Sequence, residues 1–131
     1  YRSCLKRDDD DVLIVAVGTV VYDALDAAER LERNGIRTAV LDVRCIKPLD
    51  TEALLRHSNG KKVVAVLEDN VITGGLGEQI AALLGRRVIC FAYPDEPIVQ
   101  GTVSQLKEKY GLTAGKIAEK LTAEMKRDQE N

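Results

Sequence analysis

Two neighbouring carboxylates followed by a cluster of glycines form the stretch of this sequence with the clearest chemical potential. Glu68 and Asp69 come directly after an apolar run, and Gly74, Gly75 and Gly77 follow shortly afterwards. A pair of carboxylates can exchange protons or bind a cation. Free backbone amides in a glycine-rich turn before a helix can bind a phosphate group. These five residues are therefore the first candidates for a functional site.

Each of these chemical hypotheses has a structural alternative. Consecutive side chains on a strand point to opposite faces, so Glu68 and Asp69 would not share one site if the strand continues through them. The segment from Gly74 to Gly77 matches neither of the common phosphate-binding patterns, G-x-G-x-x-G and G-x-x-x-x-G-K-[ST]. Glu78 would also compete with a phosphate for the positive end of the helix dipole. We favour carboxylates that bond to turn amides or a basic residue, and glycines that allow close packing.

The remaining candidates are weaker. Asp42 ends a predicted strand, as the ribose-binding acid of a dinucleotide fold does, but the turn at Gly18 lacks the other glycines of that motif. His57 has no Ser or Cys at a triad spacing and is expected at the surface. Cys90 lies in an apolar run and is expected to be an inert core residue, and the acidic run 8–11 predicts a solvated loop. We therefore expect no catalytic, cofactor-binding or metal site in this chain by itself.

The elements that position these residues alternate between strand and helix. Apolar runs predict strands, and amphipathic spacing between turn residues predicts the helices that connect them. Strands are predicted at 12–17, 38–43, 63–67 and 88–92, a possible edge strand within 1–6, and helices at 20–34, 51–57, 76–84, 102–111 and 114–126. This order predicts a three-layer αβα domain with a mostly parallel sheet over residues 12–126, preceded by a linker at 1–11 and followed by a frayed tail at 127–131.

Length and composition narrow the class of protein. The chain has 131 residues, enough for one domain, and a formal net charge of -2, which argues against nucleic acid or an anionic membrane as partner. The three cysteines are too widely spaced for a zinc motif and odd in number, so we expect reduced thiols in a cytoplasmic protein. The first residue is not Met and no apolar leader follows it, so we expect the numbering to begin inside a longer polypeptide.

Three segments, taken together, resemble the C-terminal domain of the transketolase family of thiamine-diphosphate enzymes. They are residues 40–50 (VLDVRCIKPLD), 66–77 (VLEDNVITGGLG) and 94–101 (PDEPIVQG). Each segment alone is loose, whereas their order and spacing are specific. The resemblance covers about residues 10–122 and implies a five-stranded mixed sheet, with one antiparallel strand, between two helix layers.

The segment after Gly101 resembles the 1-deoxy-D-xylulose-5-phosphate synthase branch of this family. Transketolases and the β subunits of 2-oxo-acid dehydrogenases share the middle segments and remain alternatives, as does a free-standing nucleotide- or phosphate-binding module. The resemblance implies that thiamine diphosphate and Mg²⁺ belong to the preceding domains, with which this domain packs in a homodimeric enzyme. It implies that this chain alone is inactive, with Glu68, Asp69, Gly74, Gly75 and Gly77 on the face toward those domains.

Overall fold

Five strands form one mixed sheet in the computed structural model, which describes residues 3–7, 11–16, 20–43, 51–71, 76–93 and 112–130. The strand order is β1-β3-β2-β4-β5. The strands are β1 (Ser3–Arg7), β2 (Val12–Ala16), β3 (Thr38–Val43), β4 (Val63–Val71) and β5 (Ile89–Tyr93). Strand β1 runs antiparallel to β3, and all other neighbours are parallel. The predicted αβα class and its single antiparallel edge strand are confirmed.

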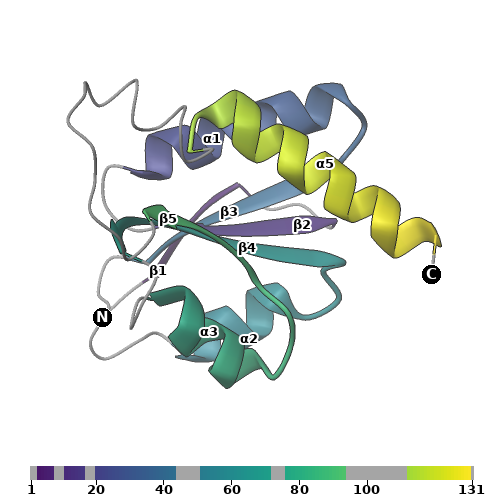
Figure 1. The fold of residues 1–131 in the computed structure, drawn as a ribbon. Coiled ribbons are helices and arrows are strands. Elements are labelled where there is room, and N and C mark those ends of the chain that lie inside the picture. The colour runs from purple at the N-terminus through teal and green to yellow at the C-terminus, as the bar shows by residue number, and fades with distance from the viewer. Residues whose placement is uncertain are drawn as a thin grey trace.

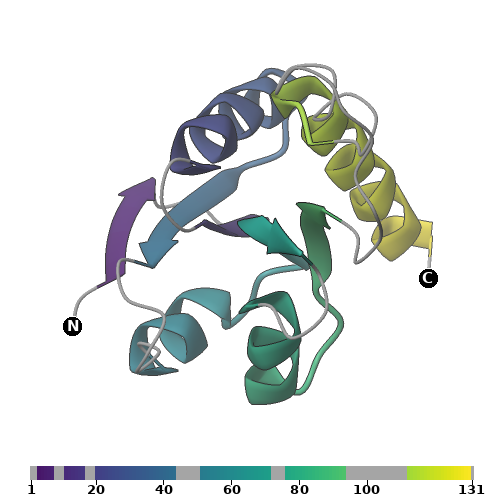
Figure 2. The same ribbon diagram turned by 60° about the vertical axis from the view of Figure 1, so that its left-hand side comes forward.

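Helices cover both faces of this sheet, as Figures 1 and 2 show. Helices α1 (Val20–Arg33) and α5 (Ala114–Glu130) lie on one face, and α2 (Thr51–Ser58) and α3 (Leu76–Leu84) lie on the other. Because strand side chains alternate between faces, the sheet contributes to two separate apolar clusters. Ile14, Val40 and Ala65 pack toward α1 and α5, whereas Val15, Leu41 and Val66 pack toward α2 and α3.

Local sequence signals set the ends of the elements. Helix α1 ends in a Schellman motif, in which the amide of Ile36 donates to the carbonyl of Leu31 and that of Gly35 donates to Glu32, both at 3.0 Å. Gly35 has a φ of 80°, a left-handed conformation that glycine adopts without strain.

No helix in the described part of the chain is long and apolar enough to cross a membrane.

Two predicted boundaries are wrong in an informative way. Strand β4 continues to Val71, whereas its apolar run predicts an end at Leu67. Helix α5 extends to Glu130, into the polar segment that we expected to fray.

The acidic run was predicted to be a solvated loop, but one of its residues is not simply solvated. The carboxylate of Asp11 accepts a 3.0 Å hydrogen bond from the backbone amide of Arg37, one residue before β3 begins. The predicted helix at 102–111 and the other aspartates of the acidic run lie outside the described residues.

Candidate functional site

A buried carboxylate joins β4 to the start of α3. Glu68 is only 5% exposed, and its Oε2 accepts a 2.9 Å hydrogen bond from the backbone amide of Gly77. Gly77 is the second residue of α3, so this amide has no partner within the helix. The negative charge also lies at the positive end of the helix dipole. Glu68 thus stabilises the helix start from a strand nine positions earlier in the sequence.

Gly77 is required here for space. A Cβ built at Gly77 would overlap Sγ of Cys90 and would lie 3.3 Å from the Cβ of Cys90. Strand β5 carries Cys90 next to β4, where Cys90 pairs in register with Val66. The backbone of α3 therefore touches the edge strand at this point, and the predicted role of glycine in close packing is confirmed at Gly77.

The thiol of Cys90 is part of the same contact. Burial raises the pKa of Cys90, and the negative charges of Glu68 and then Glu78 raise it further. A thiol with a raised pKa stays protonated and is a poor nucleophile. Cys90 is half-buried, so the expected core position is wrong. Its predicted inertness is favoured by the charges around it.

The other predicted residues of this stretch are only partly placed. The backbone of β4 continues through Asp69, which is the condition under which we expected Glu68 and Asp69 not to share a site. The side chain of Asp69, and both Gly74 and Gly75, lie outside what the structure describes. A phosphate at the start of α3 would have to displace the Glu68 carboxylate from the Gly77 amide. This hydrogen bond favours a structural role for the start of α3 over the phosphate cradle.

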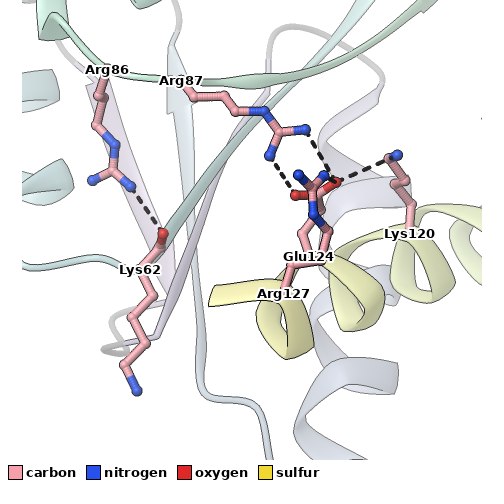
Figure 3. Close-up of polar contacts among 6 residues, drawn as sticks. All are labelled: Lys62, Arg86, Arg87, Lys120, Glu124 and Arg127. Atoms are coloured by element: carbon pink, nitrogen blue, oxygen red, sulfur yellow. Dashed lines mark hydrogen bonds and ion pairs between the residues drawn. The ribbon is translucent and has the colours of Figure 1, made fainter. Parts of the chain in front are cut away.

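A second buried carboxylate, which the sequence analysis missed, lies on α5. Glu124 is 4% exposed and accepts hydrogen bonds from Arg87 at 2.5 and 3.2 Å, as Figure 3 shows. Arg127 and Lys120 of the same helix approach it at 3.4 and 3.5 Å. The hydrogen bond from Arg87 lowers the pKa of Glu124 to about 2, against the effect of desolvation. The spacing of Lys120, Glu124 and Arg127 is a helical ion-pair signal, but the contact with Arg87 depends on the fold.

The described residues do not assemble a metal site. Among the described residues, no three His, Cys, Asp or Glu side chains lie close enough together to hold a metal ion.

The fold is that of an α/β domain, in which a five-stranded mixed sheet lies between two layers of helices. The family model "Transketolase, C-terminal domain" matches residues 3–117. The chain belongs to the transketolase C-terminal domain family.

Individual relatives agree with the predicted branch. The chain is 40% identical over 122 residues to the 1-deoxy-D-xylulose-5-phosphate synthase of Heliobacterium modesticaldum, which covers 89% of this chain and 19% of that protein. It is 39% identical over 125 residues to the enzyme of the same name from Dictyoglomus thermophilum, with 92% of this chain and 20% of that protein covered. The chain thus spans about a fifth of the length of these curated relatives.

A solved structure described as "Split gene transketolase, inactive beta4 tetramer" supports the assignment to the transketolase C-terminal domain family. It matches with a TM-score of 0.85 at 31% identity, covering 97% of this chain and 42% of that one. The transketolase of Campylobacter jejuni matches with a TM-score of 0.71 at 16% identity and shares the fold alone.

Proposed function

We propose that this chain serves as the C-terminal, non-catalytic domain of a thiamine-diphosphate-dependent transferase, of the 1-deoxy-D-xylulose-5-phosphate synthase type. Such an enzyme joins pyruvate to glyceraldehyde 3-phosphate, releases CO₂ and forms 1-deoxy-D-xylulose 5-phosphate for isoprenoid precursors. The observation that carries the proposal is the identity of about 40% to synthases of which this chain spans about a fifth. In this proposal the enzyme is a cytoplasmic homodimer, and its thiamine diphosphate and Mg²⁺ are held by the preceding domains.

The role of the chain in this proposal is to pack against those domains and to support the dimer. The proposed contact face comprises Glu68 and Asp69 of β4, Gly74 and Gly75 after that strand, and Gly77 of α3. The hydrogen bond from Gly77 to the buried Glu68 supports this role, because it fixes the base of the turn before any partner is bound. A turn held in advance loses less conformational entropy when it docks.

A domain exchange tests the proposal directly. The corresponding segment of the Heliobacterium modesticaldum synthase is replaced with this chain, and product formation from pyruvate and glyceraldehyde 3-phosphate is measured. We expect an active, dimeric chimera. The matched control carries the corresponding domain of Campylobacter jejuni transketolase, which shares the fold at 16% identity to this chain. We expect that control to form less product.

Two results would contradict the proposal. One is a chimera that is folded and dimeric by light scattering but makes no product. The other is sub-micromolar binding of thiamine diphosphate with Mg²⁺ to the 131-residue chain alone, measured by calorimetry. Hydrogen exchange at residues 74–77 should also slow in the chimera relative to the chain alone, and unchanged exchange would argue against the proposed contact face.

A further inference from the structure

A groove lies at the opposite end of β4 from the Glu68–Gly77 contact. It has a volume of about 540 Å³ and lies between the first residues of β4 and β5 and the second half of α5. Its lining consists of Lys62, Val63, Val64, Arg86, Arg87, Ile89, Glu124 and Arg127. The volume falls in the range of roughly 300–1,000 Å³ that is usual for small-molecule sites.

The charges that line this groove are strongly unequal. Four cationic residues and one carboxylate line the groove, which leaves three positive charges in excess in a chain whose net charge is -2. The Glu124 carboxylate binds Arg87 and Arg127 but compensates only one charge. Lys62 extends away from Glu124 in Figure 3 and is not joined to it. The groove therefore concentrates positive potential on an otherwise weakly acidic domain.

Two of the arginines are held in place before any ligand binds. Arg86 donates to the backbone carbonyls of Lys61 at 2.8 Å and Lys62 at 3.0 Å. These carbonyls are neutral, so they orient the guanidinium without cancelling its charge. Arg87 is oriented by its two hydrogen bonds to Glu124. A guanidinium that is already fixed loses little side-chain entropy when it binds an anion.

Three apolar residues are also among those that line the groove. Val63, Val64 and Ile89 are all buried. The cations themselves are largely exposed, with the side chains of Arg87 and Arg127 62% and 66% accessible, so their attraction to an anion should weaken as salt is added. Arginine also offers paired donors that match the oxygens of a phosphoryl group.

We propose that this groove binds a small phosphorylated molecule with at least two negative charges, such as a pyrophosphate or a phosphate ester. Its surplus charge, its preset arginines and its ligand-sized volume all match that chemistry. The proposal is independent of the function proposed above. An acidic peptide segment is the competing occupant, and the test below distinguishes the two.

The test is calorimetric titration of the full chain with inorganic pyrophosphate at low ionic strength. The double variant K62Q/R127Q removes two of the four positive charges that line the groove, so pyrophosphate should bind at least about tenfold more weakly. The matched control R33Q/K126Q removes two exposed cations outside the groove and should change affinity by less than about twofold. Thermal melts show whether all variants fold.

Backbone NMR supplies the position of the bound anion. Pyrophosphate should shift the amide signals of Arg86, Arg87 and Ile89 while leaving Gly77 unchanged. Absence of binding to the folded chain overturns the proposal, as does equal weakening in both double variants. Binding of a glutamate-rich peptide without binding of pyrophosphate overturns it in favour of an acidic protein partner.

Discussion

Two carboxylates are buried in the part of the domain that the structure describes, and they are satisfied in opposite ways. Glu68 bonds to a backbone amide at the start of α3, where backbone and cysteine are packed closely. Glu124 is surrounded by long, exposed cationic side chains from α5 and from the segment before β5. The first arrangement depends on shape and tolerates little change. The second depends on charge, so pH and salt should affect it more strongly.

Replacing Gly77 with Ala should have the largest effect on stability. The new Cβ would overlap Sγ of Cys90, so the variant should lose about 1–3 kcal/mol of unfolding free energy, as overpacked cores do. Urea denaturation measures the loss. The matched control is Gly115→Ala, where a Cβ would meet only Nη1 of Arg30 at an ordinary 3.7 Å.

A double variant sharpens this prediction. Cys90→Ala removes the sulfur that the Gly77→Ala side chain would meet, so the two changes together should cost less than their sum. If the double variant shows no such recovery, the cost at Gly77 does not come from contact with Cys90. If Gly77→Ala is as stable as the parent chain, the packing account of this glycine is wrong.

Replacing Glu68 should have the next largest effect. Glu68→Ala leaves the Gly77 amide without its acceptor and should cost about 1–3 kcal/mol, the penalty for a buried unsatisfied donor. Glu68→Gln keeps an acceptor but loses the charge at the helix dipole, so it should cost only about 0.3–1 kcal/mol. Chemical denaturation of both variants gives the comparison. Equal losses would show that the charge, rather than the hydrogen bond, stabilises the start of α3.

The outcome at Glu68 shows how far the sequence could predict this fold. Alternating apolar and amphipathic segments predict the αβα class, and the structure confirms it. The end of β4 could not be predicted, because a carboxylate favours solvent unless a partner is available. That partner is the Gly77 amide, which approaches only after α3 has packed on the sheet. The strand continues to Val71, where its backbone pairs with Tyr93 of β5.

The contacts of Glu124 with Arg87, Lys120 and Arg127 could not be predicted from the sequence, for a related reason. Arg87 and Glu124 are 37 positions apart, and their contact requires β5 at the sheet edge and α5 packed beside it. Nothing in the local sequence around Arg87 distinguishes it from a solvated surface arginine. By contrast, the glycine at position 77 could be assigned to close packing because the pattern of a phosphate loop was absent.

Replacing Glu124 with Gln should produce a moderate, pH-dependent effect. The folded pKa of about 2 lies below the ordinary value of 4.5, so the carboxylate stabilises the fold above pH 4.5 and loses this effect as the pH falls toward 2. Since exposed, screened cations surround it, we expect a loss of about 1–2 kcal/mol at neutral pH. Urea denaturation of both proteins between pH 7 and pH 2 measures the difference, which should shrink with acid.

The control for this prediction is Glu119→Gln, an exposed position on the same helix. Its stability should differ from that of the parent chain by less than about 0.5 kcal/mol at every pH, as surface substitutions usually do. A Glu124→Gln penalty that stays constant as the pH falls would mean that Glu124 acts through packing. Both buried carboxylates would then stabilise the fold through packing, and they would differ only in their position in the domain.

The smallest predicted effect concerns the reactivity of Cys90. Burial raises the pKa of this thiol, and the charges of Glu68 and Glu78 add to that effect. Glu78→Gln removes one exposed charge without changing the packing of Gly77 on Cys90, so the thiolate fraction should rise and alkylation should accelerate by up to about twofold. Mass spectrometry that resolves each cysteine measures the rate near neutral pH. Glu52→Gln on α2 is the matched control and should leave the rate unchanged. An equal acceleration in both variants would indicate a general change in net charge, whereas an acceleration confined to Glu78→Gln would show that charge also acts at the end of the domain where shape dominates.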